Sequence, residues 1–252
     1  MPDLPDDVHS ALIDVARVPR LLVASDFDGT VAPIVSNPGD ARPIPAAAEA
    51  LAALATLPST SAALISGRAL RDLRVLSGAP DVVHLVGSHG SEFDAGFLDA
   101  IDDSAKALLA ELEQTMTALT QRYPGATVEI KPVSVAFHVR NADPGHAQQA
   151  LDDALNAVRD WDIHITEGKA VREFAVIDTD KGAALDQLRQ AAEANAVVFF
   201  GDDVTDEKAF ARLTDDDIGV KVGPGDTLAR YRVDSPDDVA TALSVLLHAR
   251  SR

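Results

Sequence analysis

The sequence predicts an α/β protein with a Rossmann-like parallel sheet core and an inserted α+β domain. Over most of the chain, short apolar runs alternate with alanine- and leucine-rich stretches of helical length. That alternation is typical of βαβ units. The middle of the chain has a different order: two strand-like runs, then a helix-like stretch, then two more strand-like runs. This order can form a separate small sheet. We therefore expect a core domain at residues 1–96 and 173–252 and an inserted domain at residues 97–172.

The core domain is expected to contain five strands and five helices. The expected strands are Leu21–Ser25, Ala62–Ser66, Val82–Val86, Val197–Phe200 and Ile218–Val222. The expected helices are Pro45–Leu57, Ala69–Leu76, Lys181–Ala194, Asp206–Leu213 and Pro236–Leu247. Pro45 and Pro58 support the limits of the first helix, because proline fits a first helical turn but cannot continue a helix.

The inserted domain is expected to contain two helices and four strands. The helices are expected at Asp102–Arg122 and Pro144–Trp161. The strands are expected at Thr127–Lys131, Ser134–Arg140, Ile163–Thr166 and Val171–Ile177. Tyr123-Pro124-Gly125 ends the first helix, because proline and glycine interrupt helical structure.

Composition restricts the class of partner. The formal charge of −18 argues against binding to nucleic acid or anionic membranes, whose phosphates the protein would repel. No apolar stretch approaches the ~18 to 20 residues that span a bilayer, and the acidic N-terminus does not have the order of a signal peptide. The absence of cysteine fits a reducing compartment. We expect a cytoplasmic monomer whose partner is a small molecule.

Asp26-Phe27-Asp28-Gly29-Thr30 follows the first apolar run and carries two carboxylates one residue apart. These residues lie at the carboxyl end of a predicted strand, which is where ligands bind in open α/β sheets. One carboxylate can attack an electrophile while the other moves a proton, and the pair can hold a hard cation. The alternative interpretation is an Asp-Gly surface turn.

Two further segments at predicted strand or helix ends suit an anion. Ser66-Gly67-Arg68 follows an apolar strand and offers a hydroxyl, backbone amides and a guanidinium to a phosphate oxygen. Lys181 stands at a helix start, where a cation opposes the helix dipole unless it has an anionic partner. The structural alternatives are an ordinary helix start with Arg68 on the surface and a solvated lysine.

The segment Gly201-Asp202-Asp203-Val204-Thr205-Asp206-Glu207 directly follows a strongly apolar strand and holds four carboxylates in a run of six residues. So many acids beside a buried strand repel one another unless a cation is bound. Magnesium uses few carboxylates and keeps several waters, so it fits this group. The sequence therefore predicts a Mg²⁺ site here.

The four segments, in this order, resemble those of the haloacid dehalogenase-like phosphohydrolases. The resemblance implies that family's fold, a parallel core with an inserted cap domain, and hydrolysis of a phosphate ester. It also implies that Asp26 is the nucleophile that takes the phosphoryl group, that Asp28 is the acid and base, and that Thr30 orients Asp28. Ser66 and Lys181 would bind the phosphoryl oxygens. Mg²⁺ would lie between Asp26, the backbone carbonyl of Asp28 and Asp202. Asp203 and Asp206 would hold the metal ligands in place or contact the metal through water.

A narrower resemblance points to the trehalose-6-phosphate phosphatase family. It covers the segment 201–207, Gly87-Ser88-His89-Gly90-Ser91-Glu92, and the pattern of the inserted domain. It implies that Glu129, Lys131 and Glu173 bind sugar hydroxyls. The full set expected to contact substrate is Arg68, His89, Gly90, Glu129, Lys131, Ser134, His138, Lys169 and Glu173. The structural alternatives are a cross-strand ion pair between Glu129 and Lys131 and a histidine that only holds a turn.

Three interpretations of function follow. The first is a Mg²⁺-dependent phosphatase that acts on trehalose 6-phosphate through an aspartyl-phosphate. The second keeps this chemistry but changes the substrate to another sugar phosphate, such as sucrose phosphate or mannosyl-phosphoglycerate. The third is a phosphoacceptor switch resembling a receiver domain. Asp28 and the inserted domain argue against the third, because a switch needs neither a second in-line acid nor a cap of sugar size.

Overall fold

The computed structural model describes residues 4–94, 103–131, 133–168, 170–176 and 180–252. The chain forms two compact units, Met1–Phe97 with Asp180–Arg252 and Leu98–Thr179. The boundary expected at residue 172 is corrected by this division, because it falls inside strand β8 (Val171–Ala175). That strand pairs with β6 (Ser134–His138) and β7 (His164–Gly168) of the inserted unit.

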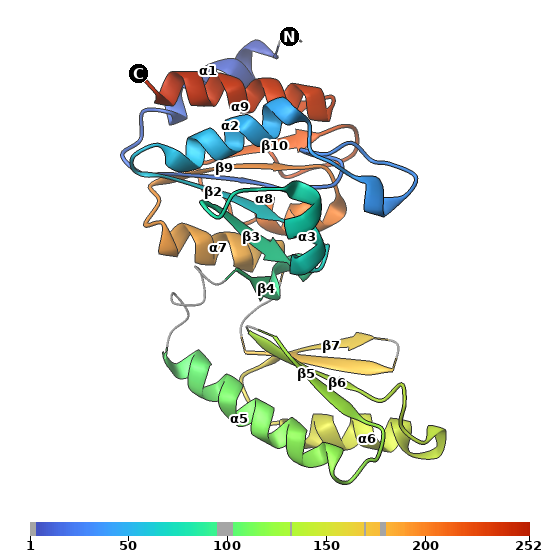
Figure 1. The fold of residues 1–252 in the computed structure, drawn as a ribbon. Coiled ribbons are helices and arrows are strands. Elements are labelled where there is room, and N and C mark those ends of the chain that lie inside the picture. The colour runs from blue at the N-terminus through green and yellow to red at the C-terminus, as the bar shows by residue number, and fades with distance from the viewer. Residues whose placement is uncertain (1–3, 95–102, 132, 169, 177–179) are drawn as a thin grey trace. The chain divides into compact units, whose positions relative to one another are not determined.

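The core unit contains a seven-stranded sheet in the order β11-β10-β9-β1-β2-β3-β4 (Figure 1). Every neighbouring pair is parallel except β3 and β4. The strands are β1 (Leu21–Ser25), β2 (Thr60–Ile65), β3 (Val83–Gly87), β4 (Glu92–Phe93), β9 (Ala196–Gly201), β10 (Ile218–Val222) and β11 (Tyr231–Val233). All five residues of β1 are buried, as expected for a strand covered on both faces.

Helices cover both faces of this sheet (Figure 1). One face carries α1 (Asp6–Val15), α2 (Pro45–Thr56) and α9 (Pro236–Arg250), and α9 packs against the other two. The other face carries α7 (Lys181–Ala191) and α8 (Glu207–Phe210), whereas Leu73 and Leu76 of α3 (Leu70–Ser77) pack into the same core as α1, α2 and α9. The fold class predicted from the sequence is therefore confirmed for this unit.

The register of the central strands explains where the predicted site residues meet. Ser25, the last residue of β1, pairs with Leu64 of β2 and with Phe200 of β9. The three strands thus end at nearly the same level. The residues that follow them, among them Asp26, Ser66 and Asp202, are delivered to one edge of the sheet.

Some elements differ from the prediction. The helix expected at Asp206–Leu213 is a 3₁₀ turn, η3 (Val204–Asp206), followed by the single-turn helix α8. Two other short turns, η1 (Pro38–Asp40) and η2 (Ser88–Gly90), lie in loops. Helix α1 and the edge strands β4 and β11 are not among the predicted elements. The two strands have only two and three residues, too few for a recognisable alternation.

The inserted unit has an antiparallel sheet in the order β5-β6-β8-β7, where β5 is Thr127–Ile130. Helices α5 (Asp103–Thr120) and α6 (Pro144–Ala157) pack with this sheet in one hydrophobic core. Val135, Phe137 and Phe174 belong to this core, so they point toward the helices. Because strand residues alternate, their neighbours point to the opposite face of the sheet. The cross-strand row Glu129, Ala136 and Glu173 lies on that face.

Asp217 is a buried carboxylate that anchors the start of β9. It accepts hydrogen bonds from the Arg189 guanidinium, from the Val197 amide at 2.8 Å and from the Thr214 amide at 2.6 Å. Burial raises the pKa of this carboxyl, but Arg189 and the two backbone amides outweigh that effect and hold the pKa below its usual value. The ionised form of Asp217 therefore stabilises the folded protein.

We expect Asp217→Ala to lower the free energy of unfolding by about 2–4 kcal/mol, because it leaves a guanidinium and two amides without their acceptor. The difference from the parent should be full above pH ~4, the pKa of an unfolded aspartate, and should shrink as the pH falls toward the lower folded pKa. Urea unfolding at pH 7 and pH 3 checks this. Asp215→Ala is the control, because its side chain is fully exposed. An equal loss for both variants would contradict the prediction.

Candidate active site

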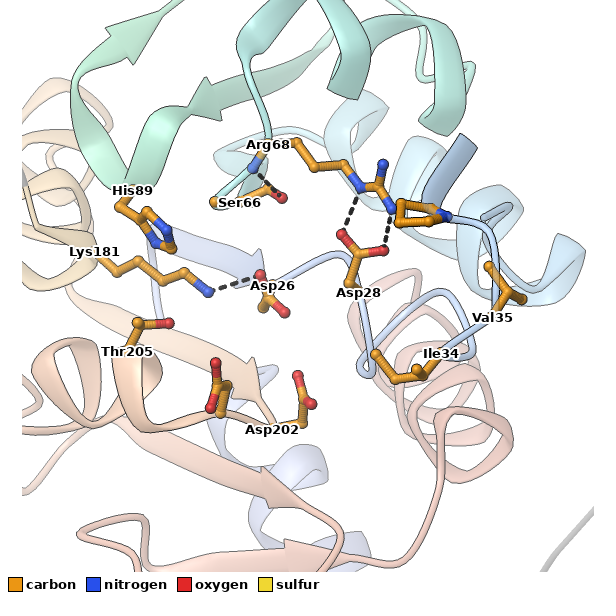
Figure 2. A pocket seen from close by; sticks show the side chains of 13 residues that line it. Asp26, Asp28, Ile34, Val35, Ser66, Arg68, His89, Lys181, Asp202 and Thr205 are labelled. Atoms are coloured by element: carbon orange, nitrogen blue, oxygen red, sulfur yellow. Dashed lines mark hydrogen bonds and ion pairs between the residues drawn. The ribbon is translucent and has the colours of Figure 1, made fainter. Parts of the chain in front are cut away.

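The nucleophile candidate Asp26 lies in a buried ion-pair network. Lys181 Nζ is 2.7 Å from Asp26 Oδ1 and 2.8 Å from Asp206 Oδ1 (Figure 2). The side chains of Lys181, Asp26 and Asp206 are only 3%, 6% and 0% exposed. Lys181 is the first residue of α7, whose N-terminal cap is the Asp180 carboxylate. The lysine at this helix start thus has the anionic partners that the sequence led us to expect.

Burial and mutual repulsion shape the charges of this network. Burial raises the pKa of Asp26 well above its usual value; Lys181 opposes the rise, whereas Asp206 and Asp202 add to it. Burial also raises the pKa of Asp202. For Lys181, burial lowers the pKa, but Asp26 and Asp206 outweigh it and the net pKa is raised. Three carboxylates lie close together and Lys181 pairs directly with only two of them, Asp26 and Asp206, so an additional cation would relieve their repulsion.

Gly29 and Thr30 bring the Asp202 carboxylate close to the Asp26 loop. Gly29 has a φ of +83°, and a Cβ atom there would lie 2.1 Å from Asp202 Oδ2, so only glycine fits. The Thr30 hydroxyl donates to Asp202 Oδ1 at 3.0 Å. The sequence led us to expect Thr30 to orient Asp28. Its hydroxyl instead holds Asp202, because the glycine turn directs it across the loop.

The carboxylates of Asp26, Asp202 and Asp206 have oxygens within 4.8 Å of one another. Asp206 has both oxygens in use, since Oδ1 accepts from Lys181 and Oδ2 accepts from the amides of Asp202 and Asp203 at 2.9 Å each. Asp203, expected near the metal, accepts from the Val204 amide and caps η3. Asp26 and Asp202 therefore form the better carboxylate pair for a hard cation such as Mg²⁺, and the donor set fits it.

Asp28 forms a two-pronged ion pair with Arg68. Arg68 Nε is 2.5 Å from Asp28 Oδ2, and Nη2 is 2.6 Å from Oδ1 (Figure 2). The Arg68 guanidinium also lies over the Phe27 ring, 5.7 Å from its centroid. The hydrogen bond with Asp28 raises the pKa of Arg68. Arg68 was expected to contact the phosphoryl group, but in this structure its charged group is bound to the second aspartate.

Ser66 and His89 form a connected wall of the site. Ser66 Oγ accepts from the Arg68 amide at 3.2 Å, and the His89 amide donates to the Ser66 carbonyl at 2.9 Å. A Cβ atom on Gly67 would lie 2.5 Å from the His89 ring, so this glycine allows the ring to pack closely. Burial and the nearby Lys181 lower the pKa of His89, which favours a neutral ring. Gly90 approaches the Asp180 carbonyl in the same way.

These residues surround a cavity of about 560 Å³ in the core unit (Figure 2). It is lined by Asp26, Asp28, Ile34, Val35, Pro38, Ser66, Gly67, Arg68, His89, Lys181, Asp202, Asp203 and Thr205. The core residues predicted for catalysis and substrate contact line this cavity, apart from Thr30 and Gly90, which are buried and do not line it.

The apolar wall formed by Ile34, Val35 and Pro38 could not be expected from the sequence, because ordinary loop residues carry no chemical signal. Lys221 was not expected at the site either; it is a buried residue of β10 whose ammonium group donates to the Asp202 carbonyl. A lysine inside the apolar run Ile218–Val222 was the available signal.

The described residues predicted to contact the sugar lie together on the face of the inserted sheet opposite its helices. Lys131 Nζ is 3.1 Å from Glu173 Oε2, and the Ser134 hydroxyl donates to Glu173 Oε1 at 2.6 Å. His138 Nε2 is 2.9 Å from Glu129 Oε2. The alternative pair between Glu129 and Lys131 is therefore replaced by two other pairs. Lys169, also predicted, lies outside the described residues.

Comparisons with known proteins agree on one family. A family model described as trehalose-phosphatase matches residues 24–237. The trehalose-phosphate phosphatase of Mycobacterium leprae is 34% identical, over 95% of this chain and 61% of that protein. The trehalose-phosphate phosphatase of Mycobacterium tuberculosis H37Rv is 35% identical, over 95% of this chain and 65% of that protein. The chain thus spans less than two thirds of the length of these relatives.

Solved structures show the same fold. The trehalose-6-phosphate phosphatase of Aspergillus fumigatus is 25% identical, with a TM-score of 0.60 over 98% of this chain and 99% of that chain. The C-terminal domain of the trehalose-6-phosphate phosphatase of Candida albicans is 24% identical, with a TM-score of 0.59 over 98% of both chains. Among the helices in the described part of the chain, none is long and apolar enough to cross a bilayer. The cytoplasmic location and the monomeric state stay predictions.

Proposed function

The chain belongs to the trehalose-phosphatase family, and we propose that it hydrolyses trehalose 6-phosphate to trehalose and inorganic phosphate. The observation that carries the chemistry is the buried Lys181, bound to Asp26 beside a cavity that also holds Ser66, Asp28 and Asp202. A carboxylate cannot approach a phosphate dianion unless cations screen their repulsion. Lys181 is placed to provide part of that screening.

The proposed first step transfers the phosphoryl group to Asp26. An Asp26 oxygen attacks phosphorus, the bond between phosphorus and the sugar oxygen breaks, and Asp28 gives its proton to that oxygen. The result is an aspartyl-phosphate and free sugar. Lys181 and the Ser66 hydroxyl stabilise the phosphoryl oxygens.

The proposed second step regenerates the enzyme. Asp28, now ionised, takes a proton from a water molecule, whose oxygen attacks phosphorus while the bond to Asp26 breaks. Inorganic phosphate and the free carboxylate of Asp26 are the products. When bound, Mg²⁺ supplies positive charge that offsets the repulsion between substrate and carboxylates. Asp26, Asp202 and the Asp28 carbonyl would hold it, and Asp203 would act through water.

For the sugar, we propose that Glu129, Lys131 and Glu173 are the main recognition residues, supported by Ser134, His138 and Lys169. The described members of this set gather on one sheet face, and they are the partners that hydroxyl groups need, since charged groups form the stronger hydrogen bonds. In the core cavity, the exposed Ile34 and Val35 offer an apolar wall that suits the C–H face of a sugar ring.

We expect trehalose 6-phosphate to be cleaved with a kcat/KM at least about 10³-fold above that of glucose 6-phosphate, because a site built for hydroxyl groups rejects a substrate that leaves its polar groups unpaired. Alanine at Glu129, Lys131 or Glu173 should lower kcat/KM on the disaccharide by roughly 10-fold to 10³-fold. The same variants should change cleavage of p-nitrophenyl phosphate much less. Phosphate release over a panel that includes sucrose phosphate and mannosyl-phosphoglycerate measures this.

Glu111→Ala is the matched control for these variants. Glu111 is an exposed acid on α5, and α5 packs against the opposite face of the same sheet, so its loss should not alter substrate preference. Equal efficiency on glucose 6-phosphate and trehalose 6-phosphate would contradict recognition of the second sugar. Faster cleavage of another disaccharide phosphate would replace the proposed substrate.

A further inference from the structure

Arg68 is held more firmly than a flexible phosphate-binding side chain would be. Two of its guanidinium nitrogens bind the two oxygens of Asp28, at 2.5 and 2.6 Å. Its charged group lies over the ring of Phe27, a side chain that is fully buried. Its side chain is only 16% exposed. A two-pronged contact of this kind fixes both the position and the plane of the carboxylate.

The two cations of the site lie on different sides of the nucleophile. Figure 2 shows Lys181 reaching Asp26 from one side, while the guanidinium of Arg68 is directed at Asp28 on the other. For Arg68 to turn the two nitrogens that hold Asp28 toward a phosphoryl oxygen, it would have to give up two charge-assisted hydrogen bonds and change its position over Phe27. Lys181 would need no such rearrangement, because it already contacts the attacking carboxylate.

We propose that Arg68 is a positioning residue for Asp28 and does not bind the phosphoryl group. This inference rests on the proposed phosphatase function, in which Asp28 moves the protons. Arg68 sets the carboxylate of Asp28 at the cavity wall; one of its two hydrogen bonds opens when Asp28 takes up a proton and re-forms when Asp28 delivers it. Loss of Arg68 therefore harms the steps that depend on Asp28 and leaves binding of the phosphate group unchanged.

A double-mutant cycle separates the two roles. Arg68→Gln, Asp28→Asn and the double variant are compared by kcat with p-nitrophenyl phosphate and with trehalose 6-phosphate. If Arg68 acts through Asp28, the double variant should be no more than about 2-fold slower than Asp28→Asn alone, because the second change removes nothing further. If Arg68 and Asp28 act independently, the fold losses in kcat of the two single variants should multiply in the double variant.

Two further readouts test the same inference. The inhibition constant of inorganic phosphate should change by less than about 3-fold in Arg68→Gln, since the ligand keeps Lys181 and Ser66. The loss should also be larger for trehalose 6-phosphate than for the burst of p-nitrophenolate, which leaves without needing a proton. Arg68→Lys keeps the charge but cannot bind both carboxylate oxygens in the same way, so it should restore little activity.

The control is Arg71→Gln, an exposed arginine on α3 that should leave activity unchanged. Thermal unfolding of each variant checks folding, and Arg68→Lys replaces Arg68→Gln in the cycle if the latter unfolds. Multiplicative losses, or a large rise in the phosphate inhibition constant, would overturn the role of Arg68 but not the phosphatase function. If the natural substrate is a sugar phosphate other than trehalose 6-phosphate, the double-mutant cycle can still be measured with p-nitrophenyl phosphate. Absence of any phosphatase activity would overturn both.

Discussion

Asp26→Asn is expected to lower kcat by at least about 10⁴-fold on every phosphate ester, because an amide cannot attack phosphorus. The fold should survive the change. Asparagine has the shape of aspartate, and its amide oxygen can still accept from Lys181 Nζ. The substitution also removes one of the charges in a cluster whose burial raises the pKa of Asp26. We therefore expect the thermal midpoint of Asp26→Asn to be equal to or above that of the parent.

Asp28→Asn provides the contrast. It leaves the proposed nucleophile in place but removes the group proposed to move the protons, so an aspartyl-phosphate formed from p-nitrophenyl phosphate should accumulate. Acid quenching followed by intact-protein mass spectrometry detects the added phosphoryl group, which Asp26→Asn should never carry. Asp40→Asn, at an exposed acid of η1, is the control for both variants. Near-normal turnover of Asp26→Asn would refute the covalent mechanism.

That the candidate site residues would meet at one edge of the sheet could be predicted from the sequence, because it depends on patterns within single segments. An apolar run followed by Asp26, another followed by Ser66 and a third followed by Asp202 are each recognisable alone. Parallel pairing of β1 with β2 and β9 then brings the ends together without further information. The helix start at Lys181 follows the same logic, since its anionic partners come from the strand ends.

The partners of individual side chains could not be predicted, because they depend on loops from different strands. Thr30 and Arg68 show this best. Each lies within a recognisable segment, yet Thr30 donates to Asp202, 172 residues away, and Arg68 pairs with Asp28, 40 residues away. The direction in which each side chain points is set by local turns, such as the turn at Gly29, where φ is positive. Lys221 was missed for a related reason. Its ammonium group reaches the Asp202 carbonyl only because β10 pairs with β9.

Removal of divalent cations with EDTA is expected to abolish turnover, and Mg²⁺ added back in excess should restore it. Without the metal, the repulsion between the substrate and three clustered carboxylates is offset mainly by Lys181, which pairs with only two of them. Binding should also be visible without catalysis. At a Mg²⁺ concentration of about 100 times its Kd, the free energy of unfolding should rise by about 2.7 kcal/mol. A thermal melt with and without Mg²⁺ measures this on the protein alone.

Alanine variants of the neighbouring acids Asp202 and Asp203 test the proposed Mg²⁺ site most directly. Asp202 is turned toward Asp26 and held by Thr30, whereas Asp203 caps its own turn. Asp202→Ala should therefore remove both the Mg²⁺-dependent rise in thermal stability and nearly all activity. Asp203→Ala should weaken the apparent Mg²⁺ affinity by no more than about 10-fold, the lower end of the usual cost of losing an outer partner of a metal site. Full activity in excess EDTA would refute the requirement for a metal. Equal losses of Mg²⁺ affinity in the two variants would show that Asp202 is not the preferred metal ligand of the two, contrary to what the orientation of their carboxylates implies.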